Sequence, residues 1–542
     1  MEKNKGKMSS NDNLNFDSFS QISSKLGFLF GIDREACTLL IGARAIDWAD
    51  DFKNYFSYCH KMEILSIKEA TTLKKEGKYY NLIICDVKAV DLINILSLLR
   101  ELLSSNGHLI LIADNKYSIK KLKRQFLRKG STSFACLGLK EYKRALKQSG
   151  FSTIRAFLPM PSIVTMEEII AEHVKTFQLP VYYHPIYKFA DKCGFYKQIH
   201  DGYIFVSSPD SEDGISRFLK GLQNELKDVV GCSHKFTLDR FDMRTRGALV
   251  LFVSDTESKD KFVVRVAVTP EIDLKIKGNA SRIHMLLTDK KVLNEVKSKL
   301  PKPVRDFQYN GKKVYVEEMI SGILAWKLIR NPVLRNKIDE EAVNFIENLN
   351  KSTRRYLKVD EDLFRSLFEE NIKLLIPLTS ASEEIGHAVE EMIAFLRDRM
   401  LGRTYPIVWT HGDFTYGNII VHPQTGEIRG IIDWDGTKDI DLPGIDLVSI
   451  RAQALSHRLH CPILDGFKSV IKDILEKGEL TLPTNLNPMN FSLDMKKLDL
   501  RVLIIAWVIR YIAGQAWYPM IITRHEQKFS DILVWIRNQT IK

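Results

Sequence analysis

The stretch WTHGDFTYGNIIVHPQTGEIRGIIDWD, residues 409–435, constrains this chain more than any other part of its sequence. It contains an apolar run at 419–421, a turn with Pro423 and Gly426, and a second apolar run at 428–432. Two short apolar runs joined by such a turn predict a β-hairpin. The hairpin would bring the residues before its first strand and those after its second strand to the same end.

Side chains with oxygen atoms occupy that end. Asp413 and Asn418 precede the first strand, and Asp433 follows the second. This Asp-to-Asn spacing is that of a loop in which the acid takes a hydroxyl proton and the amide holds a metal ion. Mg²⁺ needs about two protein oxygens beside phosphate and water oxygens, so Asn418 and Asp433 suffice. His411 would brace the loop by hydrogen bonds. The alternative is a hairpin with solvated acids, which the joint occurrence of these residues disfavours.

These motifs resemble those of the aminoglycoside phosphotransferase and choline kinase group. The family's catalytic loop is matched by HGDFTYGN and its metal-binding segment by IIDWD. The resemblance implies a two-lobed protein-kinase-like fold, ATP and Mg²⁺ as cofactors, and Asp413 as the catalytic base. The run DLPGIDL, residues 441–447, is similar to the family's acidic stretch, in which Asp446 would fix the catalytic loop.

The resemblance extends upstream to a nucleotide-binding lobe at 212–322. Residues 248–254 and 261–268 are β-rich runs on either side of a charged turn, and they predict paired antiparallel strands. Gly247 is the only glycine of FDMRTRGALV, where the family has its phosphate-covering loop. Arg265 stands where protein kinases have the lysine that grips the nucleotide phosphates, and a guanidinium pairs well with phosphate oxygens.

The segment VYVEEMISG is similar to the family's hinge strand, with Glu318 and Met319 at the positions whose backbone would bind the adenine edge. The helix carboxylate that tethers the strand base in kinases is missing from IKGNASRIHMLL, since Glu271 comes too early and Glu295 too late. Helical periodicity dominates residues 325–400 and again residues 441–542. We therefore expect residues 323–542 to form a mainly helical second lobe.

Residues 27–208 have a different pattern. Short apolar runs alternate with amphipathic stretches and predict a mostly parallel sheet, doubly wound by helices. The apolar runs are CTLLIGA, MEILSI, YNLIICD, GHLILIA and YIFVSS. Their order resembles a class I S-adenosylmethionine-dependent methyltransferase. The fold class is therefore α/β followed by α+β, with a boundary in the turn-rich segment 206–216.

The cofactor loop of this first domain departs from that family. The loop IGARAIDW carries Arg44 and Trp48 where several glycines would let the cofactor approach the backbone. MEILSI ends in Ser66 and Ile67, without the acid that would hold the ribose hydroxyls. We therefore expect a degenerate domain that does not bind S-adenosylmethionine.

Composition narrows the class further. The polar residues 1–26 lack the apolar stretch of a signal peptide and predict a disordered leader, and seven scattered cysteines without a CxxC indicate reduced thiols in a cytoplasmic protein. Polar residues interrupt the apolar run 500–523, which favours a buried helix over a membrane span. The net charge of +12 suits an anionic partner, and peripheral membrane contact stays open. No basic and aromatic stripe indicates nucleic-acid binding.

The sequence therefore predicts a phosphotransferase acting on a hydroxyl of a small molecule or a glycan. One alternative is a regulatory protein that binds nucleotide without turnover. Another is a bifunctional methyltransferase and kinase of surface-polysaccharide modification. An antibiotic-resistance phosphotransferase is compatible with the motif, but the large fused domain disfavours it. The acceptor, the choice between ATP and GTP, and the oligomeric state remain undetermined at this level.

Overall fold

A computed structural model describes residues 22–477 and 499–541. Within these ranges the gaps are 31, 33, 47–48, 63–66, 87–90, 116–136, 161–167, 172–173, 175–199, 201, 211, 231–234, 243–247, 381 and 517–518. The chain divides into two compact units. The first comprises Met1–Ile276 and Lys302–Met319, and the second comprises Lys277–Pro301 and Ile320–Lys542.

The amino-terminal part of the first unit is an open sheet with neighbouring strands in the order β2-β1-β3-β4-β7-β5. The first four of these are parallel to one another, and β7 is antiparallel to both of its neighbours. The strands are β1 (Cys37–Ile41), β2 (Tyr58–Met62), β3 (Tyr80–Asp86), β4 (Leu103–Asp114), β5 (Thr153–Met160) and β7 (Gly202–Ser208). The helices are α1 (Ile22–Phe30), α2 (Ala43–Ile46), α3 (Ala49–Tyr55), α4 (Ile67–Lys75), α5 (Leu92–Leu102) and α7 (Leu139–Gln148).

Two details of this part differ from the prediction. The second strand, β2, ends at Met62 and α4 begins at Ile67, so the apolar segment MEILSI is not that strand, and its residues 63–66 lie outside the described ones. Helix α1 begins at Ile22, inside the segment predicted as a leader, and buries Leu26. An apolar helix so close to the amino terminus gains stability from packing on the sheet.

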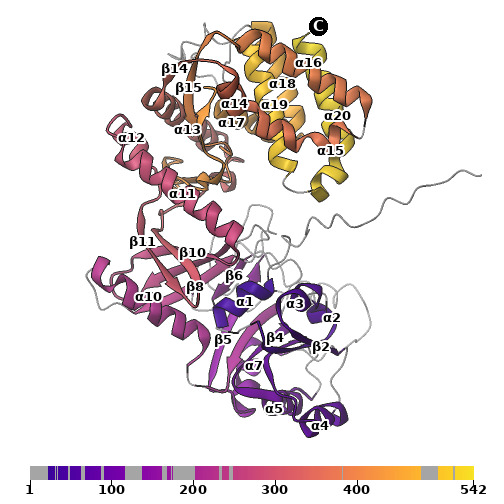
Figure 1. Cartoon of the computed structure of the whole chain (residues 1–542). Helices are drawn as coiled ribbons and strands as arrows, with labels where there is room; N and C mark the ends of the chain where they lie inside the picture. The colour runs from indigo at the N-terminus through magenta and orange to yellow at the C-terminus, as the bar shows by residue number, and fades with distance from the viewer. Residues whose placement is uncertain are drawn as a thin grey trace, which may run out of the picture. The chain divides into compact units, whose positions relative to one another are not determined.

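The sheet continues beyond β5 into the segment predicted as the nucleotide-binding lobe (Figure 1). Among the described residues it contains twelve strands. Strand β6 (Glu168–Ala171) pairs antiparallel with β5 on one side and with β8 on the other. The remaining elements are β8 (Phe236–Asp242), β9 (Ala248–Asp255), β10 (Lys261–Ala267), β11 (Pro303–Tyr309), β12 (Lys312–Glu318) and the helix α10 (Gly214–Val230). The antiparallel pairing of β9 with β10 confirms the predicted hairpin.

One hydrophobic core runs under this continuous sheet. It contains Leu40 and Ile84 of the parallel strands together with Val264 and Val316 of β10 and β12. The predicted boundary at 206–216 therefore lies beside a shared core, and the division into domains at 27–208 and 212–322 stays a prediction.

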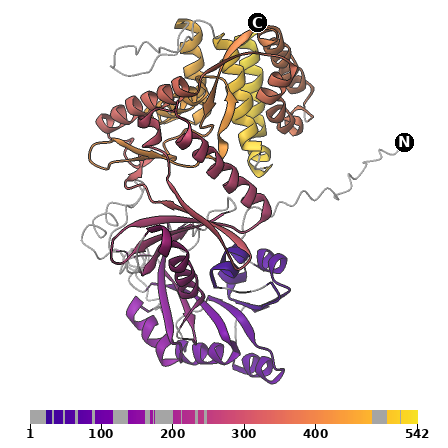
Figure 2. The same ribbon diagram turned by 60° about the vertical axis from the view of Figure 1, so that its left-hand side comes forward.

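The second unit is mainly helical, as Figure 2 shows for its carboxy-terminal part. Two small sheets, β13-β16-β17 and β14-β15-β18, accompany the helices. Helix α11 (Pro270–Thr288) contains the boundary between the units. The strands are β13 (Ile323–Leu324), β14 (Arg355–Lys358), β15 (Thr404–Thr410), β16 (Ile419–Val421), β17 (Ile428–Ile431) and β18 (Lys438–Asp441). The helices are α12 (Asn294–Lys297), η2 (Ala325–Lys327), α13 (Pro332–Thr353), α14 (Glu361–Leu374), α15 (Ile376–Thr379), α16 (Glu383–Met400), η3 (Trp434–Gly436), α17 (Ile445–Leu459), α18 (Ile463–Lys477), α19 (Leu500–Ala516) and α20 (Pro519–Thr540).

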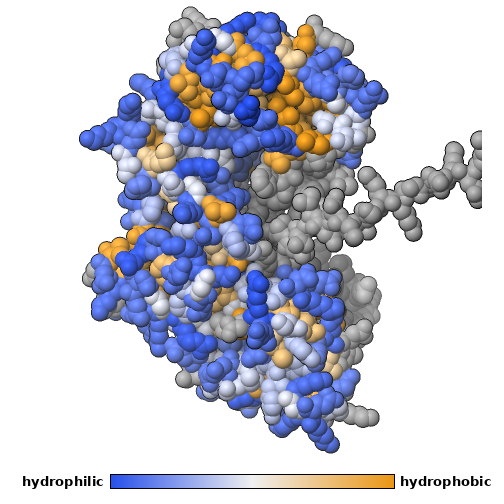
Figure 3. All heavy atoms as spheres, viewed as in Figure 1, coloured by the Kyte–Doolittle hydropathy of each residue, from blue (hydrophilic) through white to orange (hydrophobic). Residues whose placement is uncertain are grey.

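The apolar run 500–523 is divided between α19 and α20. Val502 to Ile509 are all buried, in agreement with the expected core helix. Among the described helices, none combines the length and the hydropathy that crossing a bilayer requires. Hydrophilic side chains cover most of the face seen in Figure 3, and apolar side chains gather over α18 and α19.

Candidate active site

The predicted catalytic loop joins β15 to β16 in the second unit. Gly412 adopts φ +86°, a conformation that residues with a Cβ rarely adopt. A Cβ at this position would lie 2.1 Å from the carbonyl oxygen of Gly436. The loop therefore needs a glycine here, because the backbone of the next segment packs directly against it.

Asp446, at the start of α17, holds the loop by two hydrogen bonds. Its carboxylate accepts hydrogen bonds from the backbone N–H groups of His411 at 2.7 Å and Gly412 at 2.9 Å. Burial raises the pKa of Asp446, against the opposing effect of these contacts. The predicted structural role of this acid is confirmed by both hydrogen bonds.

His411 is buried and holds the loop to the strand that follows it in the hairpin. Its Nε2 lies 2.9 Å from the carbonyl oxygen of Ile432, and its ring packs edge-on against Trp434. The backbone N–H of Asp413 donates to His411 Nδ1 at 3.3 Å, so Nε2 carries the proton donated to Ile432. This is the bracing role expected from the sequence.

Asp413 itself is exposed at the tip of the loop. Asn418 donates through Nδ2 to the Asp413 backbone oxygen at 2.9 Å and to its Oδ2 at 3.0 Å. Because the amide nitrogen donates to Asp413, the Asn418 side-chain oxygen is the atom that could coordinate a metal ion. The loop thus places a carboxylate and an amide side by side.

The hairpin β16–β17 brings Asp433 to the same end, as predicted. Its strands pair antiparallel, and the Ile432 N–H donates to the backbone oxygen of Asn418 at 2.9 Å. Asp433 has φ 66° and ψ 58°, a left-handed conformation uncommon for a residue with a side chain. Such backbone is often found at functional sites.

Asn418 and Asp433 offer oxygen ligands of the kind that Mg²⁺ prefers. Across the described residues, no three His, Cys, Asp or Glu side chains gather in a group that could hold a metal ion. Asn418 and Asp433 supply one amide oxygen and one carboxylate, which is how proteins bind Mg²⁺ together with substrate phosphates. The residues therefore suit a metal ion that arrives with a nucleotide.

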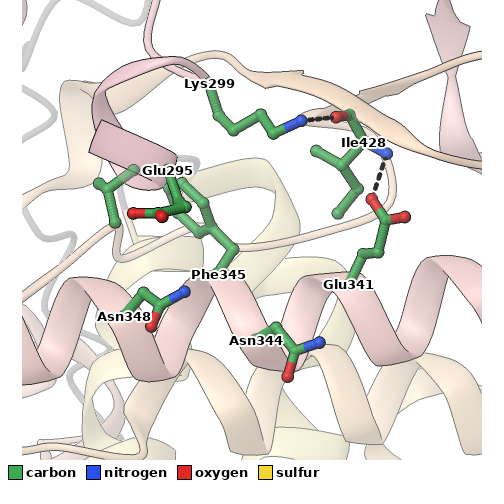
Figure 4. A pocket seen from close by; sticks show the side chains of 8 residues that line it. Glu295, Lys299, Glu341, Asn344, Phe345, Asn348 and Ile428 are labelled. Carbon is green, nitrogen blue, oxygen red and sulfur yellow. Dashed lines mark hydrogen bonds between the residues drawn. The ribbon is translucent and has the colours of Figure 1, made fainter. Parts of the chain in front are cut away.

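Strand β17, which leads to Asp433, is clamped at its first residue. Lys299 donates to the carbonyl oxygen of Ile428, and the Ile428 N–H donates to Glu341 of α13 at 2.7 Å (Figure 4). Further along the strand, the Ile431 N–H donates to the Lys299 carbonyl oxygen at 2.8 Å. Lys299, Glu341 and Ile428 line an open pocket of about 140 Å³ whose lining includes no residue of the predicted catalytic loop. The clamp therefore supports the hairpin from outside the site.

The first unit contains the predicted phosphate-gripping base. Arg265 on β10 donates from Nε and Nη2 to Glu317 of the adjacent strand β12, at 3.2 and 3.1 Å. The carboxylate that pairs with Arg265 therefore comes from strand β12 and not from the following helix. Helix α11 begins at Pro270, earlier than the sequence suggested, and its Asp273 accepts from Tyr315 at 2.8 Å. The Arg265–Glu317 pair could have been anticipated as a diagonal cross-strand contact.

The predicted hinge positions are Glu318, the last residue of β12, and Met319 directly after it. The Met319 N–H donates to the carbonyl oxygen of Lys261 at 2.8 Å, and the Glu318 N–H donates to that of Lys302 at 2.9 Å. Both backbone N–H groups already donate to backbone carbonyl oxygens. If the backbone of these two residues binds adenine, it would do so through its carbonyl oxygens. Gly247, predicted in the phosphate-covering loop, lies outside the described residues.

The segment that the resemblance assigns to a cofactor loop follows β1, near the carboxyl ends of β3 and β4. Ligands of such sheets bind where the strand order reverses, here between β1 and β3. Arg44 occupies this position: Nε donates to Asp86 Oδ2 at 2.9 Å and Nη1 to Asp114 Oδ1 at 2.9 Å. A Cβ on Gly42 would lie 2.4 Å from the Asp86 carbonyl oxygen, so the backbone is also closely packed. Trp48 lies outside the described residues.

Comparison with known proteins supplies a class for part of the chain. Residues 249–468 match the model of the phosphotransferase enzyme family, APH. The matched segment contains Arg265, the catalytic loop, Asp433 and Asp446, and it ends within α18. No curated protein sequence matches the chain.

Solved aminoglycoside phosphotransferases are similar to about half of the chain. One is ADP-bound APH(2'')-Ib, with 15% identity and a TM-score of 0.31, covering 52% of this chain and 90% of that one. Another is the streptomycin–ATP–APH(2'')-IIa ternary complex, with 12% identity and a TM-score of 0.34, covering 59% and 98%. A third is APH(3'')-Id from Streptomyces rimosus ATCC10970 with ADP and streptomycin, with 13% identity and a TM-score of 0.32, covering 53% and 97%.

Proposed function

We propose that this chain is an ATP-dependent phosphotransferase that transfers a phosphoryl group to a hydroxyl of a small molecule or a glycan. The observation that carries the proposal is the joint placement of Asp413, Asn418 and Asp433 at one end of the β16–β17 hairpin. The family match of residues 249–468 supports the reaction class. The nucleotide-bound neighbours are consistent with ATP as the donor.

Each residue has a defined part in the reaction. Asp413, exposed and oriented by Asn418, accepts the proton of the acceptor hydroxyl as the hydroxyl oxygen attacks the γ-phosphorus of ATP. The bond from this phosphorus to the β,γ-bridging oxygen breaks, and ADP leaves with the electron pair. Asn418 and Asp433 would hold Mg²⁺, which neutralises developing charge on the phosphates when bound. His411 and Asp446 keep the loop in place without touching the substrate. Arg265, with Glu317, is proposed to contact the nucleotide phosphates.

Three further expectations from the sequence belong to the same proposal. The amino-terminal sheet is proposed to be methyltransferase-like and not to bind S-adenosylmethionine, because Arg44 pairs with Asp86 and Asp114 at the carboxyl ends of β3 and β4. We also propose that the protein is cytoplasmic and that Glu318 and Met319 recognise ATP. A regulatory role without turnover is less favoured, since Glu317 provides the carboxylate that the sequence alone did not offer.

A direct test uses the purified full-length chain with Mg-ATP and candidate acceptors: sugars, nucleoside diphosphate sugars, choline and aminoglycosides. Mass spectrometry of the acceptor would detect a gain of one phosphoryl group. The same reaction with Asp413→Asn is the control for a contaminating kinase. Transfer that is equal for both proteins would contradict the proposal.

A further inference from the structure

One charged side chain of helix α19 (Leu500–Ala516), that of Arg510, lies against the predicted catalytic loop. The helix is strongly apolar, and Val502 to Ile509 are buried in the core of the second unit. Arg510 follows this run, and its side chain is only 11% exposed. A buried guanidinium is costly unless its donors are satisfied, so its partners define what it does.

Those partners come from three separate points around the loop. Nη1 lies 3.2 Å from Thr410 Oγ1 and forms an ion pair with Asp441. Nη2 donates to the carbonyl oxygen of Gly436 at 3.0 Å. Asp441 also accepts from Thr410 Oγ1 at 2.7 Å, which closes the network. One side chain thus joins the end of β15, the turn after Asp433 and the end of β18.

Gly412 shows how closely this network is packed. A Cβ on this glycine would lie 2.4 Å from Arg510 Nη2, as well as 2.1 Å from the Gly436 oxygen. The guanidinium therefore lies where the segment leading to Asp413 crosses the segment that follows Asp433. Burial lowers the pKa of Arg510 to about 10, with the Asp413 charge acting in the opposite direction, so the side chain remains protonated at neutral pH.

We propose that Arg510 is a positioning residue that holds Asp413 in register with the Asp433 segment. The inference rests on the proposed phosphotransferase function and adds to it a residue from outside the matched family segment, which ends at residue 468. Phosphoryl transfer depends mainly on positioning, and a displacement of about 1 Å can cost about 10²-fold in rate. Arg510 acts through the backbone of the two segments and touches neither the nucleotide nor the acceptor.

The test compares Arg510→Met and Arg510→Lys with the wild type in Mg-ATP hydrolysis, with water as the acceptor. Arg510→Met should lower kcat by about 10- to 100-fold with the KM for ATP within about twofold, since ground-state binding is untouched. Arg510→Lys should restore part of kcat because it keeps the charge. Arg451→Met is the matched control: Arg451 is also buried and pairs with Asp473 in the same unit. It should destabilise the fold while leaving kcat near that of the wild type.

Loss of folding would make Arg510→Met uninformative by itself, because Asp441 would be left buried without its cation. The double variant Arg510→Met, Asp441→Asn removes both charges and should show the same fall in kcat. A folded double variant with wild-type kcat would overturn the inference.

Amide hydrogen exchange gives a second readout that does not depend on turnover. Peptides covering 411–418 and 434–437 should exchange faster in the double variant than in the wild type, and at the wild-type rate in Arg451→Met. Unchanged exchange in both segments would refute the positioning role. If Asp413→Asn hydrolyses ATP as fast as the wild type while the exchange effect is present, the proposed function fails and the contact between the segments stands.

Discussion

The side-chain amide of Asn418 donates a hydrogen bond of 3.0 Å to the carboxylate of Asp413. This contact couples the proposed base to a proposed metal ligand, because the nitrogen orients Asp413 while the oxygen of the same amide faces the other way. Both residues belong to a loop that is held from the protein interior by Asp446. Substitutions in this set should therefore separate proton transfer from metal binding.

Asp413→Asn should abolish phosphoryl transfer and leave nucleotide binding largely intact. The base contacts the acceptor hydroxyl and not the nucleotide, and general-base catalysis contributes about 10²- to 10⁴-fold. The measurement is kcat on the true acceptor, together with the thermal shift produced by Mg-ATP. Wild-type turnover by this variant would show that Asp413 is not the base.

Asp433→Asn should weaken the effect of Mg-ATP on stability. The variant loses the carboxylate that the metal ion needs, since Asn418 supplies only a neutral amide. In the wild type, Mg²⁺ alone should produce little shift in Tm and Mg-ATP a clear one, because the phosphates complete the coordination. An equal Mg-ATP shift in wild type and variant would argue against the metal role of Asp433.

Much of the fold could be predicted from periodicity. The strands β1, β3 and β4 are buried apolar runs, α5 is an amphipathic helix between β3 and β4, and α7 is an amphipathic helix between β4 and β5. Strand β2 was missed because it is the edge strand: it pairs only with β1 among the described strands, and its residues are half-exposed and polar. Strand β6 and the continuous sheet could not be predicted, since long-range pairing leaves no local pattern.

The candidate site was also predictable only where its residues lie close together in the sequence. The catalytic loop and Asp433 lie within one short stretch, so spacing was enough to find them. The partner of Arg265 was sought on the next helix, but antiparallel pairing places Glu317 beside it. Arg510 is one of the polar residues that interrupt the apolar run 500–523, but its partners could not be predicted, because it lies 100 residues from Thr410 and only folding brings the two together.

Glu317→Gln should raise the KM for ATP several-fold with a smaller change in kcat. The substitution removes the carboxylate that orients Arg265, so the guanidinium loses its fixed position for phosphate oxygens. Asp306→Asn is the control, because Asp306 pairs with Lys313 on the surface of the same sheet. Steady-state kinetics of both variants should separate them, and equal KM values would contradict the role of the Arg265–Glu317 pair.

Lys438 should make stability depend on pH in the alkaline range. Burial, aided by the nearby Arg510 charge, lowers the pKa of Lys438 to about 8. Between pH 8 and about 10.5 the unfolded chain still binds the proton that the folded chain has released, so the free energy of unfolding rises with pH. Lys438→Met should lack this rise. Parallel plots of Tm against pH for the wild type and the variant would show that Lys438 does not titrate in this range.

S-adenosylmethionine and S-adenosylhomocysteine should leave the Tm unchanged. Arg44 lies at the carboxyl ends of β1, β3 and β4 and pairs with Asp86 and Asp114, so a bound cofactor would have to displace a paired guanidinium. A ligand at 100 times its Kd stabilises a fold by about 2.7 kcal/mol, so occupancy would be visible in a thermal melt. Mg-ATP serves as the positive control on the same protein. A saturable shift with S-adenosylmethionine that disappears in Asp86→Ala would place a working cofactor site in the crevice and make the chain bifunctional.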